Sequence, residues 1–158
     1  MAKNKNKFYS LAIDNIQEIS YNYNGDFDFL QLSKTSLIYE MNNSIKIDNE
    51  KNIIGLRMGI CYRYAETNES LAEYNILVNF KIPELNELVS KEKDKLKFED
   101  NSLLMNLLHI TIGTLRGALF LKLKGTPLEK FPLPLIPYSS LEKVMATNNN
   151  NQHSPANV

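Results

Sequence analysis

Hydrophobic and polar residues alternate along much of the first half of the chain, with the period of two that is typical of β-strands. The clearest alternation covers residues 52–65 and 71–82, which are separated by the polar turn 66–70. The two apolar rows are Ile54, Leu56, Met58, Ile60, Tyr62 and Tyr64, and Ala72, Tyr74, Ile76, Val78, Phe80 and Ile82. One apolar face opposite a polar or small-residue face predicts an antiparallel sheet that is covered on one side only.

Two weaker strands are predicted before these. Within residues 14–26, the row Gln17, Ile19, Tyr21 and Tyr23 alternates with Glu18, Ser20 and Asn22. Asn24-Gly25 offers a turn after this row. Ser44–Asp48 predicts a short second strand, whereas residues 27–40 have no clear period and leave open part of a strand or a long connection. The prediction is an α+β fold with a four-stranded antiparallel sheet.

The second half of the chain predicts helices. Pro83 suits the first turn of a short helix over 83–89, and the charge run 90–100 favours a solvated linker or helix face. Asp100 or Ser102 provides an N-cap for a long helix that runs to about Lys124. Its apolar residues cover more than one stripe, so a single sheet leaves apolar surface for a partner subunit. The residues assigned to that contact are Leu104, Leu108, Gly113, Leu115 and Gly117.

The apolar stretch 103–123 also has about the length of a membrane span. It contains Asn106, His109 and Arg116, and a central arginine costs about 2.5–3.5 kcal/mol on insertion scales. A buried helix without membrane insertion is therefore the prediction.

The segment KGTPLEKFPLPLIPYSSL, residues 124–141, combines four prolines with many apolar residues. Gly125 fits the C-terminal end of the long helix. So many prolines exclude a helix or a central strand, and they stiffen the segment, so apolar side chains are held outward at low entropic cost. Two interpretations stay open: the segment walls a groove for another chain, or it covers the protein's own core. A short last helix is predicted to begin at its final serines.

Composition narrows the classes of function. The 158 residues carry 18 basic and 18 acidic side chains, and this zero net charge gives no electrostatic footprint for nucleic acid. Cys61 is the single cysteine and the N-terminus lacks a signal-like apolar core, so we expect a cytoplasmic protein. We expect a single domain over residues 14–146, between an N-terminal segment 1–13 and a disordered polar tail 147–158.

Patterns for catalysis and metal binding are weak. Cys61 and His109 would form a nucleophile pair only if folding brought them together, and their spacing gives no support for this. A buried structural cysteine and a core or groove histidine are the preferred interpretation. NGDFDF has two carboxylates but lacks the other ligands of a calcium loop. We therefore predict no enzyme, no metal and no cofactor.

The order of the elements and the proline segment resemble the SecB family of export chaperones. The segment is similar to that family's lid loop, in which a basic residue and Gly-Thr end the long helix. A proline and alternating leucines follow, and an aromatic residue and a leucine begin the last helix. The matching residues are Lys124, Gly125, Thr126, Pro127, Leu133, Leu135, Tyr138 and Leu141. Residues 42–48 and 52–82 are similar to its second, third and fourth strands, so the resemblance covers about 14–144.

The resemblance implies an assembly and a function. It implies a homotetramer built as a dimer of dimers, with the long helices sandwiched between sheets. It also implies ATP-independent binding of unfolded or non-native polypeptide in apolar grooves. One groove wall would consist of Leu128, Phe131, Leu133, Leu135, Ile136 and Tyr138, and another of Phe80, Ile82, Leu85 and Leu88.

Two features differ from the SecB proteins that deliver clients to the SecA motor. Those proteins are strongly acidic on the open sheet face, whereas this chain is neutral and carries Arg57 and Arg63 there. The tail NNNNQHSPANV also has no apolar or basic character with which to bind the motor. A dedicated chaperone of one client, such as an antitoxin, fits this surface at least as well as export. The alternative from another class is a non-catalytic adaptor that binds one folded partner, such as a toxin–antitoxin component.

Overall fold

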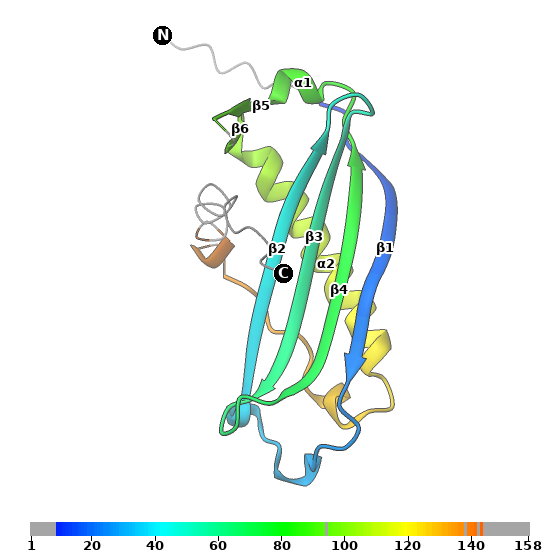
Figure 1. Cartoon of the computed structure of the whole chain (residues 1–158), viewed down its shortest axis with the longest axis vertical. Helices are drawn as coiled ribbons and strands as arrows, with labels where there is room; N and C mark the ends of the chain where they lie inside the picture. The colour runs from blue at the N-terminus through cyan, green and yellow to red at the C-terminus, as the bar shows by residue number, and fades with distance from the viewer. Residues whose placement is uncertain (1–8, 94, 138, 142, 144–158) are drawn as a thin grey trace, which may run out of the picture.

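The computed structural model describes residues 9–93, 95–137, 139–141 and 143. A four-stranded antiparallel sheet has the strand order β1-β4-β3-β2, and the long helix α2 crosses one of its faces (Figure 1). The strands are β1 Ala12–Tyr23, β2 Leu37–Asp48, β3 Ile53–Tyr64, β4 Ser70–Lys81, β5 Val89–Glu92 and β6 Lys95–Phe98. The helices are α1 Leu85–Leu88, α2 Asn101–Leu123 and the 3-10 turns η1 Phe29–Gln31, η2 Lys34–Ser36 and η3 Pro127–Lys130. The predicted α+β fold, with its long C-terminal helix, is confirmed.

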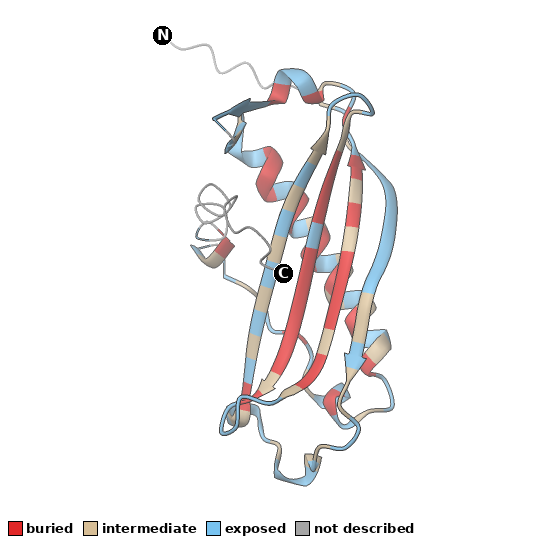
Figure 2. Cartoon of the chain, in the orientation of Figure 1, coloured by how far each residue is buried: buried red, intermediate tan, exposed pale blue. Residues whose placement is uncertain are grey.

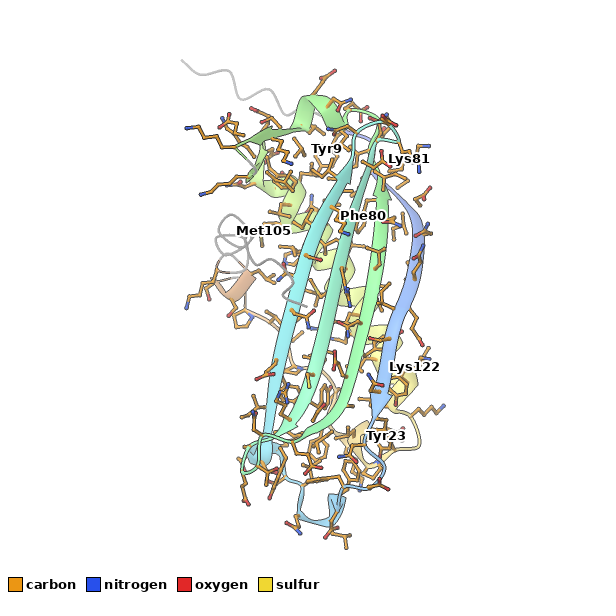
Figure 3. The ribbon with its side chains drawn as sticks, in the orientation of Figure 1. Tyr9, Tyr23, Phe80, Lys81, Met105 and Lys122 are labelled. Carbon is orange, nitrogen blue, oxygen red and sulfur yellow. The ribbon has the colours of Figure 1, made fainter. Side chains whose placement is uncertain are left out.

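The core lies between the sheet and α2. Both predicted apolar rows are buried there, and β3 and β4 are the most deeply buried strands (Figure 2). Phe80 of β4 and Met105 of α2 are among the residues that meet in this core (Figure 3). At the end of the sheet where β2 begins and β3 ends, the ring of Tyr39 packs edge-on against that of Tyr62, with centroids 4.8 Å apart. The alternation in the sequence therefore predicted the covered face correctly.

Strand β2 is longer than predicted. The sequence indicated a strand over Ser44–Asp48 and left open part of a strand within residues 27–40, and β2 in fact begins at Leu37 and pairs with β3 over 12 residues. Leu37, Tyr39 and Met41 continue the row of Ile45 and Ile47 on the helix side of the sheet. The polar run of residues 42–44 interrupts this row and hides the period. The preceding residues 27–36 form the connection, with η1 and η2 in it.

The face assignment of β1 was wrong in part. β1 pairs with β4, and register shifts occur between Ile13 and Asn15 and between Glu18 and Ser20. Tyr21 therefore lies opposite Tyr74 on the helix side, whereas Gln17 lies opposite Leu77 on the open side. A β-bulge changes which side chains share a face, and simple alternation does not detect it.

The charge run 90–100 was also predicted wrongly. It contains β5 and β6, which form a two-stranded hairpin instead of a linker or helix face. Val89 is buried and Leu96 and Phe98 pack against the core, so a few apolar anchors hold a mostly lysine-bearing hairpin.

Helix α2 begins as predicted. The carboxylate of Asp100 accepts hydrogen bonds from the Ser102 backbone N–H at 2.8 Å and from the Ser102 hydroxyl at 2.6 Å. These bonds lower the pKa of the Asp100 carboxyl. α2 is the one described helix that is long and apolar enough to cross a membrane, and half of its most apolar window is buried within the protein.

Candidate functional site

The proline segment begins with a tight turn at the end of α2. Gly125 has a positive φ of 80°, a conformation that favours glycine, and it ends the helix as predicted. The Thr126 hydroxyl donates to the Leu123 carbonyl at 2.7 Å and accepts from the Leu128 N–H at 3.2 Å. These bonds turn the chain back, so that Leu128 of η3 is fully buried in the core.

Two side chains hold the segment after η3 through its backbone carbonyls. Tyr62 of β3 donates its hydroxyl to the Phe131 carbonyl at 2.9 Å. Arg116 of α2 donates to the carbonyls of Leu133 and Pro134, at 3.3 Å and 3.2 Å. Prolines leave this stretch with few N–H donors, so its carbonyls need donors from elsewhere. Residues 131–137, which we call the lid, are therefore fixed to both the sheet and the helix.

A pocket of about 370 Å³ lies between α2, η3 and the lid. This volume falls within the range of about 300–1,000 Å³ that is usual for ligand pockets. Its lining is mostly apolar and consists of Tyr62, Gly113, Arg116, Gly117, Leu119, Phe120, Leu123, Leu128, Glu129, Pro132 and Leu133. Gly113 and Gly117 have nothing within 4 Å of an added Cβ atom, so these glycines form a shallow part of the wall.

Apolar side chains are exposed in the lid and in the pocket wall. Leu135 of the lid is 85% exposed, and Phe120, in the pocket wall, is 51% exposed. Leu121 is exposed next to Phe120 on the outward side of α2. Apolar groups that stay exposed around an apolar pocket are typical of a surface that contacts another molecule.

The structure separates the predicted groove residues into two groups. Leu128 and Leu133 line the pocket although both are buried, Leu135 is exposed in the lid, and Phe131 and Ile136 are half-buried. Tyr138 lies outside the described residues. The predicted second wall is placed elsewhere: Phe80, Ile82, Leu85 and Leu88 are buried in the core and present no surface to a client. The opposite wall is instead formed by α2 residues, including Gly113, Arg116, Gly117 and Phe120.

The residues predicted for helix self-association also divide into two groups. Leu104, Leu108 and Leu115 are buried in the core. Gly113 and Gly117 face outward and line the pocket. The leucines therefore pack within this chain, and only the two glycines are open to another molecule.

The last turn of α2 is joined to the edge strand β1 by a polar cluster. Lys122, in this last turn (Figure 3), donates to Glu18 at 2.8 Å and 3.1 Å. Its ammonium lies 5.3 Å from the centroid of the Tyr21 ring. The Lys122 hydrogen bond is the largest cause of the lowered pKa of the Glu18 carboxyl. Burial, together with the nearby Glu18, raises the pKa of Tyr74 to about 12, and Tyr74 donates to Glu18 at 3.2 Å. This cluster fixes the end of the helix from which the proline segment begins.

Cys61 and His109 are not brought together. The Cys61 thiol is buried on the open side of the sheet, 3.3 Å from the Ser70 hydroxyl. His109 lies on α2, which covers the opposite side (Figure 1). Within the described part of the chain, no group of three or more His, Cys, Asp or Glu side chains is placed to hold a metal ion.

The open face of the sheet is polar and internally hydrogen-bonded. The Asn79 amide donates to Asn15 at 2.8 Å, and the Asn75 amide donates to Ser20 at 3.0 Å and to Glu73 at 2.9 Å. On the same face, Arg63 pairs with Glu40, which raises the pKa of the arginine. The apolar pocket therefore lies on the opposite side of the sheet from this polar face.

Comparison of the chain with protein-family models, with curated proteins and with solved structures gave no match. The function is therefore inferred from the geometry of the pocket and the lid.

Proposed function

We propose that the protein is an ATP-independent, SecB-like chaperone that binds unfolded or non-native polypeptide in the pocket between α2 and the lid. The observation that carries this proposal is an apolar pocket of about 370 Å³ whose lid is held by Tyr62 and Arg116. A fixed lid displays Leu135 without the entropic cost of ordering it at each binding event.

The energetics of the pocket support weak binding that tolerates many sequences. Burying one large apolar side chain contributes about 1.5–3 kcal/mol. A dissociation constant of 1 mM already requires about 4 kcal/mol, so one pocket alone holds a client only briefly. Several pockets in a homo-oligomer, a dimer or tetramer, would raise the effective affinity for a long unfolded chain. Such an assembly requires a subunit contact that leaves the pocket open, and therefore one outside Gly113 and Gly117, which line it.

The charge distribution favours a chaperone dedicated to one client over a chaperone that delivers clients to the SecA motor. Glu40 and Glu73, on the open face, are engaged by Arg63 and Asn75. Arg57 is exposed on the same face. We therefore propose a cytoplasmic chaperone for one or a few partners, with export as the alternative.

The proposal is tested by aggregation of a chemically unfolded enzyme, diluted into buffer without nucleotide and followed by light scattering. Leu135→Ser removes an exposed apolar group of the lid and Phe120→Ser removes one of the pocket wall, and both variants are expected to weaken suppression of aggregation. Leu30→Ser is the matched control, because Leu30 is 96% exposed but lies on η1 and not in the pocket wall. No suppression by the wild type, or equal losses in all three variants, would overturn the proposal.

A pull-down of one stoichiometric folded partner, without affinity for unfolded chains, would favour the adaptor function instead. Light scattering of the purified protein gives the molar mass, and a strictly monomeric chain would remove the proposed self-association.

A further inference from the structure

Strand β2 forms one edge of the sheet (Figure 1). β3 pairs with it, and no described strand pairs with its other side. β2 keeps one register over its 12 residues and contains no proline, whereas the other edge strand, β1, contains two register shifts. An unbroken edge without proline is a template for an added strand.

The outward backbone groups of β2 belong to its odd-numbered residues. The Ala65 N–H donates to the Ser36 carbonyl at 2.8 Å, directly before the ladder begins with Leu37 opposite Tyr64. In an antiparallel ladder, hydrogen-bonded and non-hydrogen-bonded residue pairs alternate. The even-numbered residues of β2 are therefore bonded to β3, and the N–H and C=O groups of the odd-numbered residues point away from the sheet.

The apolar row of β2 is complementary to a second copy of itself in one antiparallel register. When two copies meet at Asn43, Tyr39 lies opposite the partner's Ile47, and Met41 lies opposite the partner's Ile45. Every apolar side chain of this row from Tyr39 to Ile47 then faces another apolar side chain, and the polar Asn43 faces its own copy. A shift of two residues in either direction places Asn43 opposite Met41 or Ile45 instead.

The charges on the open side match in the same register. Glu40 lies opposite the partner's Lys46, so a twofold pairing forms this contact twice. Lys46 is exposed and forms no ion pair with the described residues. One oxygen of Glu40, Oε2, accepts from Arg63, and the other accepts no hydrogen bond from the described residues. Glu40, Glu73 and Arg63 line one pocket on this side, where two carboxylates meet one guanidinium, so a further cation is attracted there.

We propose that a second copy of this chain pairs antiparallel with β2 about Asn43 and joins the two sheets into one continuous sheet. Each outward-facing residue from Tyr39 to Ile47 donates and accepts once, which gives about ten backbone hydrogen bonds. No residue of β2 lines the pocket beneath the lid, so the contact does not use the wall of that pocket. The contact goes beyond the proposed chaperone function and does not require the lid pocket to bind anything.

Charge variants test the contact through the molar mass of the full-length chain, measured by light scattering over a series of concentrations. Lys46→Glu sets two carboxylates opposite each other at both contacts and is expected to weaken dimerisation about tenfold. Glu40→Lys sets two ammonium groups opposite each other. A mixture of the two variants forms attractive pairs only between unlike chains, so native mass spectrometry should show mainly heterodimers. Lys124→Glu is the matched control, because it changes the charge equally at an exposed lysine outside β2, and it should dimerise like the wild type.

Disulfide trapping tests the register. Asn42 and Ser44 are exposed on the open side, and each lies opposite the other across the proposed twofold axis. Their Cα atoms would be about 4.5 Å apart, which lies within the range that a disulfide spans. In a Cys61→Ala background, a mixture of Asn42→Cys and Ser44→Cys should form a disulfide-linked dimer under oxidised glutathione. Either variant alone should form much less of it.

Three results would overturn the contact. They are a monomeric wild type at all concentrations, dimerisation of Lys46→Glu equal to that of the wild type, and disulfide formation by either cysteine variant alone as readily as by the mixture. Leu135→Ser is expected to leave dimerisation unchanged. A monomeric protein that still suppresses aggregation would overturn the β2 contact and leave the chaperone proposal standing, so the two failures are distinguishable.

Discussion

Gly59 lies on the open side of β3, between the side chains of Asn75 on β4 and Asn42 on β2. A Cβ atom at this position would overlap the Asn75 carbonyl oxygen and lie 2.7 Å from that of Asn42. Asn75 is buried and donates to Ser20 and Glu73, so it cannot move without losing these bonds. Gly59→Ala is therefore expected to destabilise the fold, although alanine is usually favoured over glycine within a strand.

The size of the effect follows from these contacts. Two hydrogen bonds contribute about 1 kcal/mol each, and displacing a buried amide adds about 1 kcal/mol. Alanine loses less backbone entropy than glycine on folding, and this difference offsets about 0.5–1 kcal/mol of the cost. The net loss in the free energy of unfolding is about 2 kcal/mol, which corresponds to a Tm lower by about 4–8 °C for a chain of this size.

Urea unfolding followed by far-UV circular dichroism measures this loss, and a double-mutant cycle tests its cause. Asn75→Ala alone is expected to cost about 2 kcal/mol. Gly59→Ala should cost almost nothing more in that background, because the overlapping Asn75 amide is gone and the exposed Asn42 side chain can move away. The expected coupling is thus about 2 kcal/mol. As a control, Gly113→Ala is expected to stabilise the chain by about 1 kcal/mol, since nothing lies within 4 Å of the added Cβ on an exposed helix face. Additive costs at Gly59 and Asn75 would show that overlap with the Asn75 amide does not cause the loss.

Three further predictions concern the lid and its support. Arg116→Met removes both hydrogen bonds to the lid carbonyls, which together contribute about 2 kcal/mol. Tryptic cleavage after Lys130 should therefore become about 30-fold faster. An unchanged cleavage rate, followed by mass spectrometry, would contradict this role of Arg116. Lys122 lowers the pKa of the Glu18 carboxyl, so the pair stabilises the fold above the ordinary carboxyl pKa and this contribution is lost as the pH falls through the lowered pKa. Lys122→Met should therefore flatten the acid side of a plot of urea midpoint against pH, and an equal slope would argue against the pair. Leu128→Ala should cost about 2–5 kcal/mol by calorimetry, because Leu128 is fully buried; a neutral result would mean that η3 does not anchor the lid.

The sequence was most informative where packing repeats with a fixed period. β3 and β4 lie in the middle of the sheet, and every second side chain enters the core, so alternation located both strands and their covered face. The edge strands were harder to predict because they are less constrained. In β2, the polar Asn43 interrupts the apolar row, and in β1, bulges shift the row from one face to the other. Both occur because an edge strand tolerates polar residues and irregular pairing.

The candidate site was predicted in part for a related reason. Proline content indicated an irregular segment after the helix, and the structure places Leu135 in the open as that interpretation requires. The second wall was assigned by resemblance to Phe80 and its neighbours, which are buried. A helix that is apolar on several sides does not reveal which side meets the sheet. Gly113 and Gly117 were the signal that could have identified the outward wall. Glycine is unfavourable within a helix, so two glycines one turn apart indicate a surface that another group approaches closely.

The position of these two glycines links the proposed client binding to the proposed self-association. Gly113 and Gly117 line the pocket beneath the lid, and they are also the only residues of the predicted subunit contact that face outward. One surface cannot contact a partner helix and a client side chain at the same time. Association through this stripe therefore covers the pocket, and a client that fills the pocket displaces the partner. Subunit contact through this stripe and avidity from several open pockets therefore exclude each other. Assembly through another surface, such as the β2 edge, would leave the pockets open, as the proposed avidity requires.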